Sequence, residues 1–220
     1  YSFATGNELN MNLKILSLLI IEVCILLPDV CYAFFSKDVH LLNMQNGLAD
    51  NTVSAVYKDK EGFIWFGTRN GLSRYDGRRI TNFERSRSYP SISNLKEVFD
   101  GVLAFVDNGV FSAFDLKKER FLSVVSSSGQ GIPSRGMLQR NDSLVWVISG
   151  SELHLMKRCA SKEGELRLRV QEKYTGWNNQ DNLLVAITYS SDKKSICLID
   201  EKGRIILLDA TNLNSFRVID

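Results

Sequence analysis

The feature that most constrains the fold is a tight turn, Asn70-Gly71, between two short strand-forming runs within residues 62–77. Trp65 in the first run and Leu72 in the second supply the bulk that β-strands favour. An Asn-Gly pair accepts the positive φ angles that a two-residue hairpin turn requires. Because a lone hairpin is only marginally stable in water, other strands of the chain must cover it.

Weaker copies of this hairpin recur downstream, at residues 101–115, 143–156 and 195–209. Their turn residues fall at positions 71, 109, 151 and 203, so the copies are 38, 42 and 52 residues apart. A repeat of about 40–45 residues is typical of a propeller blade, which contains four strands. The spacing therefore predicts a repeat architecture.

Each copy also has one strand-like run before the hairpin and another after it. The leading runs cover residues 53–57, 95–99, 135–139 and 183–188, and the outer runs cover residues 80–83, 121–125, 167–174 and 216–219. We predict an all-β chain, a partial β-propeller at residues 34–220 with about four antiparallel, four-stranded blades. These blades are expected near residues 47–85, 93–126, 132–176 and 182–220. The alternative is a β-sandwich, whose turn signals recur every 8–12 residues or so without a long period.

The start of the chain has a different composition from the repeats. Lys14 precedes an apolar run that Glu22 interrupts, and this run is shorter than the roughly 20 apolar residues of a membrane span. Residues 11–33 are therefore predicted to be a secretory signal peptide, with residues 1–10 upstream of it. A lipid anchor on Cys31 is less favoured, because the residues before it are not small.

Charge and cysteine content narrow the class of protein further. The net charge is +2, and basic residues form no block, so we predict no nucleic-acid partner. Cys159 and Cys197 follow the predicted signal peptide, and both a disulfide between them and two free thiols remain open. No Cys or His spacing indicates a metal, and we predict no metal and no cofactor.

Residues 65–77, preceded by Gly47-Leu48 and by residues 51–59, resemble the two-component regulator propeller repeat. This repeat builds the periplasmic sensor of hybrid two-component systems in Bacteroides-type bacteria. The resemblance is strong across residues 40–85, and from residue 93 onward only the hairpin spacing remains.

The resemblance implies two seven-bladed propellers, a β-sandwich, one membrane span, a histidine kinase and a DNA-binding response regulator. It also implies a homodimer and an exported, periplasmic location in an inner-membrane protein. Those later modules are not in this sequence, so the blades are expected to continue beyond Asp220, and kinase activity would belong to that missing part.

In an up-and-down blade, the loop before the first strand and the central hairpin turn lie at the same end of the sheet. The sequence therefore gathers amide and charged side chains on one rim: Asp50, Asn51, Arg69, Asn70, Asp107 and Asn108. Beside aromatic residues, such groups suit an oligosaccharide, an acidic one in particular. Turn chemistry alone also explains Asn70 and Asn108.

Catalysis has little support in the sequence, and no catalytic residue is predicted. His40 and His154 do not lie beside an evident nucleophile. Asp76, Asp115 and Asp209 recur at one blade position, which is a property of the repeat. We therefore expect a ligand-sensing propeller; the alternatives are a protein-interaction scaffold and, third, a propeller glycan hydrolase or lyase.

Overall fold

The computed structural model of the protein describes residues 41–84, 92–177 and 182–219. Within them the chain is built of β-strands, with one short 3-10 helix, η1 (Met44–Asn46). The predicted signal peptide at residues 11–33 and the segment upstream of it lie outside the described residues.

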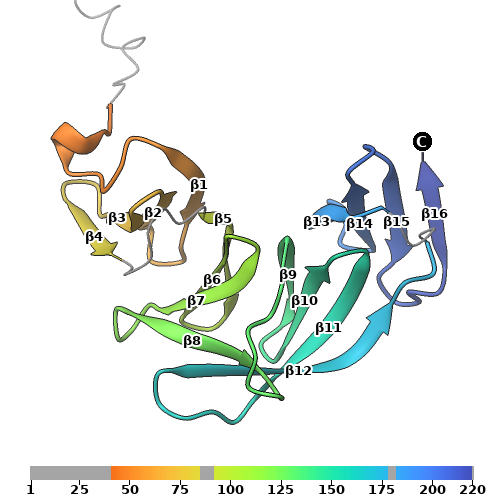
Figure 1. The fold of residues 1–220 in the computed structure, drawn as a ribbon. Helices are drawn as coiled ribbons and strands as arrows, with labels where there is room; N and C mark the ends of the chain where they lie inside the picture. The colour runs from red at the N-terminus through yellow and green to blue at the C-terminus, as the bar shows by residue number, and fades with distance from the viewer. Residues whose placement is uncertain (1–40, 85–91, 178–181, 220) are drawn as a thin grey trace, which may run out of the picture. The chain divides into compact units, whose positions relative to one another are not determined.

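The strands form four consecutive groups of four, which we call blades 1 to 4 (Figure 1). Blade 1 contains β1 (Val53–Lys58), β2 (Ile64–Thr68), β3 (Gly71–Tyr75) and β4 (Ile80–Glu84). Blade 2 contains β5 (Ile92–Phe99), β6 (Val102–Asp107), β7 (Val110–Asp115) and β8 (Arg120–Ser126). Blade 3 contains β9 (Gly136–Asn141), β10 (Leu144–Ser149), β11 (Glu152–Cys159) and β12 (Glu165–Tyr174). Blade 4 contains β13 (Leu184–Tyr189), β14 (Ser195–Asp200), β15 (Ile205–Asp209) and β16 (Phe216–Ile219). The predicted four-stranded antiparallel blades are confirmed.

Layers of apolar side chains fill the space between successive blades. One layer joins blades 1 and 2 through residues such as Trp65, Leu103 and Phe114. The other two layers join blade 2 to blade 3 and blade 3 to blade 4. Every residue of β6 is buried, because its alternate side chains enter two different layers. In β15 exposed and buried residues alternate, as expected of a strand covered on one face.

Trp65 is the central side chain of the layer between blades 1 and 2. Its ring is 1% exposed and lies 5.6 Å from the Phe83 ring and 5.5 Å from the Phe114 ring, measured between centroids. The indole Nε1–H donates to Asp59 Oδ2 over 2.7 Å, so burial leaves no unpaired polar group on this residue. The predicted packing role of Trp65 between blades is therefore confirmed.

Blades 2 and 3 are joined at their outer strands, which the sequence did not indicate. Residues 165–168 of β12 pair in parallel with residues 123–126 of β8, so the two blades form one eight-stranded sheet (Figure 1). β12 is ten residues long, and Leu166 and Leu168 are fully buried in the layer between the blades. Burial of these leucines brings the edge of β12 beside the unpaired edge of β8, whose backbone groups it satisfies.

The faces of blades 1 and 4 that point away from their neighbours carry exposed apolar side chains. On blade 4, Ile199, Ile205 and Ile219 are paired across three strands and are 36%, 38% and 40% exposed. On blade 1, Val56 is 61% exposed and pairs with Phe66, which is half-buried. Apolar side chains gathered on an exposed sheet face are typical of a surface that contacts another element or another molecule.

The hairpin turns agree only partly with the predicted turn chemistry. Asn108 and Gly109 both have positive φ, 49° and 78°, as a two-residue type I′ turn requires. Gly71 has φ of 116°, but Asn70 is not among the residues with positive φ, so that part of the prediction was wrong. The Thr68 hydroxyl instead accepts from the Asn70 N–H and donates to the Gly71 carbonyl, which stabilises a different turn. In blade 3 the left-handed residue is Gly150, not residue 151.

The recurring aspartates are structural elements of the repeat. Asp76 Oδ1 accepts from the N–H groups two and three residues later, over 2.7 and 2.6 Å. Asp115 and Asp209 accept from the same two positions in blades 2 and 4. Each carboxylate thus closes the turn between the third and fourth strands of its blade.

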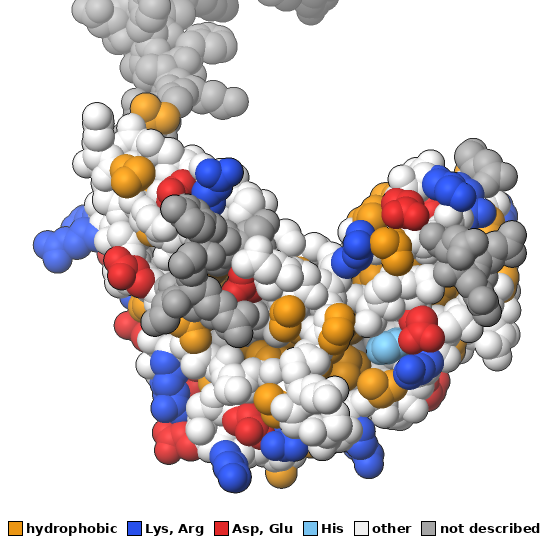
Figure 2. Space-filling view, viewed as in Figure 1, with side chains coloured by type: hydrophobic (Ala, Val, Ile, Leu, Met, Phe, Trp, Pro, Cys, Tyr) orange, Lys and Arg blue, Asp and Glu red, His pale blue; other side chains and the backbone are white. Residues whose placement is uncertain are grey.

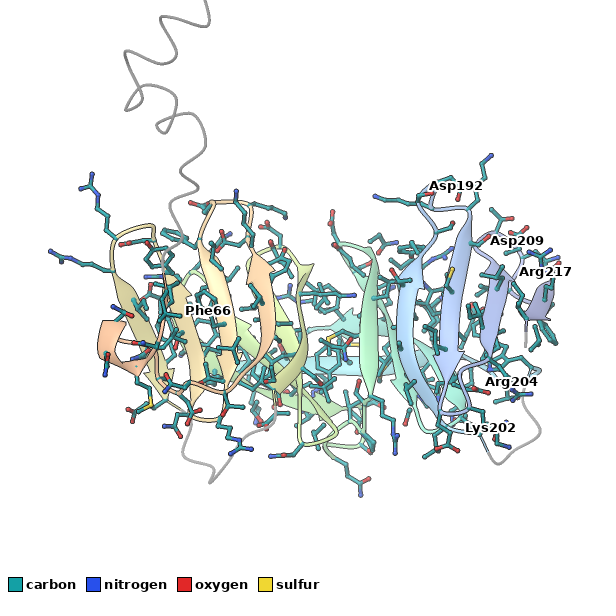
Figure 3. The ribbon with its side chains drawn as sticks, turned by 90° about the horizontal axis from the view of Figure 1, so that it is seen from above. Phe66, Asp192, Lys202, Arg204, Asp209 and Arg217 are labelled. Carbon is teal, nitrogen blue, oxygen red and sulfur yellow. The ribbon has the colours of Figure 1, made fainter. Side chains whose placement is uncertain are left out.

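Replacing Trp65 with alanine should lower the free energy of unfolding by about 3–5 kcal/mol, because a large cavity opens between blades 1 and 2. Phe66→Ala is the matched control, since Phe66 is on the same strand and the opposite face, where it is half-buried (Figure 3). That variant should cost about 1 kcal/mol. Urea denaturation followed by tryptophan-independent far-UV circular dichroism measures both, and equal costs would contradict the assigned packing.

The aspartate turns should make stability fall in acid. The N–H groups of Arg79 and Arg78 hold the pKa of Asp76 below its ordinary value, and the hydroxyl and N–H of Thr211 do so for Asp209. A carboxyl whose pKa is lowered by folding stabilises the folded state above its ordinary pKa, and this contribution disappears as the pH falls through the lowered value.

The double variant Asp76→Asn, Asp209→Asn keeps one acceptor oxygen in each of the two turns, and neither asparagine can titrate. Its unfolding free energy should therefore decline less steeply than that of the parent between about pH 4 and pH 2. Urea titrations at several pH values measure the slope. Asp142→Asn is the control, an exposed aspartate that makes no hydrogen bond to the described residues. Identical slopes for parent and double variant would refute the role of these turns.

Candidate functional site

The structure places the six predicted ligand residues at one end of blades 1 and 2. The Ser54 hydroxyl donates to the carbonyls of Gly67 and Ile92, over 3.2 and 2.5 Å, so the start of blade 2 lies beside that end of blade 1. Ile92 pairs with Asp107, which precedes the central turn of blade 2. We call this end, where the central hairpin turns of the blades lie, the turn rim.

Three of the six side chains are engaged with the backbone of the turn rim. Asp50 Oδ1 accepts from the Thr52 N–H over 2.6 Å, and Asn51 Oδ1 accepts from the Met44 N–H over 2.8 Å. Asn70 Nδ2 donates to the Ala49 carbonyl over 3.0 Å, which ties the central turn to the loop before β1. These three hydrogen bonds therefore stabilise the loops that form the turn rim.

The other three residues differ in exposure. Asp107 is fully buried, and Asn108 Nδ2 donates to its Oδ1 over 3.2 Å. Arg69 is exposed and forms no ion pair with the described residues. Asn51, Asn70 and Asn108 are exposed too, but each is engaged in a hydrogen bond, so Arg69 is the candidate for a contact with a ligand.

The opposite rim holds a cavity of about 280 Å³ between blades 1 and 2, and none of the six predicted residues lines it. Phe63 and Trp65 form its apolar wall. The Arg74 guanidinium lies 4.9 Å from the centroid of the Phe63 ring and 5.6 Å from that of Trp65, within range of a cation–π interaction. Arg74 Nη1 also contacts Glu119 Oε1 at 2.6 Å.

The lysines around this first cavity are already paired with carboxylates. Lys60 Nζ lies 3.1 Å from Glu97 Oε1 and 3.7 Å from Asp100 Oδ1, and Lys117 Nζ lies 3.5 Å from Asp100 Oδ2. Glu97 Oε1 also accepts from the Gly101 N–H. A charged ligand here would have to displace existing ion pairs, so the arrangement is better explained as a joint between two blades.

A second, more open hollow of about 630 Å³ lies between blades 3 and 4, on the same rim as the first cavity. It is lined by residues 139–141 at the end of β9, by Tyr189 and Lys193 from blade 4, and by residues 210 and 211 after β15. We call it the blade 3–4 groove. Figure 3 shows the two rims of blade 4, with Asp192 and Asp209 toward this end and Lys202 and Arg204 toward the other.

The remaining reactive side chains do not form a catalytic constellation within the described residues. His154 Nε2 lies 2.6 Å from Glu152 Oε2, and Glu152 is also 3.5 Å from Lys173 Nζ. The His154 contact lowers the pKa of Glu152, so the carboxyl stays ionised. No group of three His, Cys, Asp or Glu side chains in the described part is placed to hold a metal ion. Cys159 and Cys197 are both free thiols, which resolves the question that their sequence left open.

No helix among the described residues is long and apolar enough to cross a membrane. On the face shown in Figure 2, acidic and basic side chains are interspersed with hydrophobic ones.

Sequence reasoning missed the residues of both cavities. They come from strand ends and loops at the rim opposite the predicted one, and each cavity combines side chains of two blades. One feature of the sequence pointed to the second cavity. Arg140 follows a predicted strand and immediately precedes Asn141, a residue type that favours turns, so its side chain could be expected to be exposed.

Comparison with known proteins agrees with this architecture. Residues 47–70 match the family model described as the two component regulator propeller. No curated protein matches the chain.

Several solved structures share the fold. The extracellular domain of the putative hybrid two component system BT3049 from B. thetaiotaomicron has 16% identity and a TM-score of 0.62, over 83% of this chain and 24% of that one. The extracellular domain of the putative one component system BT4673 from the same organism has 14% identity and a TM-score of 0.61, over 83% and 27%. The β-propeller domain of Cps50 (Swd1) from Myceliophteria thermophila has 16% identity and a TM-score of 0.53, over 76% and 56%.

The chain thus spans about a quarter of the length of the first two structures. The family match covers the loop before β1, all of β1 and β2 and the start of the central turn, which is the segment that carried the resemblance in the sequence. Residues 47–70 of blade 1 therefore match the two component regulator propeller, and the described chain has a β-propeller fold.

Proposed function

We propose that this chain is the N-terminal part of a periplasmic, ligand-sensing propeller of a hybrid two-component system. In this proposal the propeller binds an oligosaccharide and signals across the inner membrane to a histidine kinase that is absent from this chain. The match of residues 47–70 to the two component regulator propeller supports the class of protein. The extracellular domains of B. thetaiotaomicron that share the fold support an exported location.

The exposed faces of the outer blades support a longer propeller. Ile199, Ile205 and Ile219 form an apolar strip across blade 4, on the side away from blade 3. The layers between the described blades are built from the same kinds of residue. A further blade of the same protein would bury this strip as β10 and β6 are buried.

The observation that carries ligand binding is Arg69 on the turn rim. It is exposed, makes no ion pair with the described residues, and belongs to the same turn as Asn70. A guanidinium donates paired hydrogen bonds to carboxylates and hydroxyls, and amide groups beside it add directional contacts. This chemistry fits an oligosaccharide, and an acidic one in particular.

Arg69→Ala should weaken oligosaccharide binding by about tenfold to a hundredfold, because a charge-assisted hydrogen bond contributes about 1.5–3 kcal/mol. Isothermal titration calorimetry on the full periplasmic region, with a panel of neutral and acidic oligosaccharides, measures the loss. Arg217→Ala is the control, because Arg217 is an exposed arginine on β16 of blade 4 (Figure 3). Unchanged affinity in Arg69→Ala would place the ligand elsewhere.

The alternative is a periplasmic scaffold that binds other proteins without signalling. The exposed apolar side chains of blades 1 and 4 favour it, since such surfaces also mark protein interfaces. A membrane span and kinase motifs in the sequence that follows residue 220 would support the sensor. Absence of heat across the whole oligosaccharide panel would favour the scaffold.

A further inference from the structure

The blade 3–4 groove contains two cations without acidic partners among the described residues. Arg140 at the end of β9 and Lys193 in the turn after β13 both line it, and both are exposed. Arg140 Nη1 donates to the Ala210 carbonyl over 3.5 Å, and no ion pair engages either residue within the described part of the chain. The lining of the groove therefore carries two cations that form no ion pair with the described residues.

This charge distribution is the reverse of that in the first cavity. There, Lys60 and Lys117 are each within 4 Å of a carboxylate, and the lining includes four acidic residues. The lining of the blade 3–4 groove includes none. An anionic group could contact Arg140 and Lys193 without displacing an ion pair, which lowers the cost of binding.

The carboxylates that adjoin the groove in sequence are used in their own turns. Asp192 Oδ1 accepts from the Ser190 hydroxyl and from the Lys194 N–H, over 2.6 and 3.0 Å. Asp209 Oδ1 accepts from the Thr211 N–H and hydroxyl, over 2.7 and 2.6 Å. Their donors are neutral and hold the pKa of each carboxyl below its ordinary value, so both carboxylates keep their negative charge beside the groove, but neither forms an ion pair with Arg140 or Lys193.

The floor of the groove is suited to the ring of a sugar. Tyr189 and Ala210 pack against the apolar layer between blades 3 and 4 and still line the groove. Arg140 lies over the buried Trp146 ring, with its guanidinium carbon 5.3 Å from the centroid, so its position is fixed by packing. Asn141 Oδ1 accepts from two backbone N–H groups, which leaves its amide N–H groups for a ligand.

We propose that the blade 3–4 groove binds a carboxylate-bearing saccharide. The carboxylate would lie between Arg140 and Lys193, and the sugar ring would lie on Tyr189. The inference rests on the proposed ligand-sensing function, narrows its acidic oligosaccharide to one that bears a carboxylate, and adds a second set of residues on the rim opposite Arg69. The volume of about 630 Å³ is within the usual range for small-molecule sites.

The test is calorimetric titration of the full-length protein with trigalacturonate, the neutral galactose trimer and inorganic phosphate. Trigalacturonate should bind, and its affinity should fall as salt is added, because exposed cations are screened. Arg140→Gln and Lys193→Gln should each weaken binding about tenfold, as loss of one charge-assisted hydrogen bond predicts. The control is Lys202→Gln, on the other rim of blade 4 (Figure 3), which should bind as the parent does.

Lys193→Gln separates binding from folding, because the Lys193 side chain is exposed and lies outside the apolar layer between the blades. Equal binding of the neutral trimer, or unchanged affinity in both variants, would overturn the proposal. Binding of phosphate as tight as that of trigalacturonate would reduce the groove to a simple anion site and overturn it as well. Trigalacturonate binding that is lost in Arg69→Ala alone would overturn this inference and leave the proposed function standing; no binding of any saccharide would overturn both.

Discussion

Packing of each four-stranded sheet against the next, through a shared layer of aromatic and aliphatic side chains, is the interaction on which this structure depends. A sheet of four short strands is apolar on both faces when it lies between two others, and β6 and β10 are buried almost throughout for this reason. Trp65 shows how a layer can accommodate a polar atom, because its Nε1–H is paired with Asp59 inside the layer, whereas the buried Trp146 Nε1–H has no partner among the described residues. Blades 1 and 4 also carry apolar side chains on the face that no described blade covers.

The repeated parts of the fold could be predicted from sequence because each depends on neighbouring residues. The run around Trp65, the Asn108-Gly109 turn and the aspartates at the third turn of blades 1, 2 and 4 have local causes, namely strand propensity and turn chemistry. The conformation of Asn70 could not be predicted, because the Thr68 hydroxyl and the Ala49 carbonyl determine it. Neither partner can be recognised from the Asn-Gly pair itself.

Sites between blades are harder to predict for a related reason. Arg140 and Lys193 are far apart in the chain and reach one groove only because blades 3 and 4 share an apolar layer. Which charges find partners also depends on that packing, as the ion pairs of Lys60 with blade 2 show. The sequence gives the turn residues on a rim, whereas the balance of charge in a groove requires both blades to be in place.

The pairing of β8 with β12 makes the junction between blades 2 and 3 different from the other two junctions. Separating blades 2 and 3 would break backbone hydrogen bonds between residues 123–126 and residues 165–168. The ion pairs of Glu163 with Lys118 and Arg120 would break too. Among the described residues, no backbone ladder joins blade 1 to blade 2 or blade 3 to blade 4, and both cavities lie at these two junctions. Blades 2 and 3 are therefore tied through their backbones as well as their side chains, whereas each outer blade is held to this central sheet by an apolar layer and by individual hydrogen bonds.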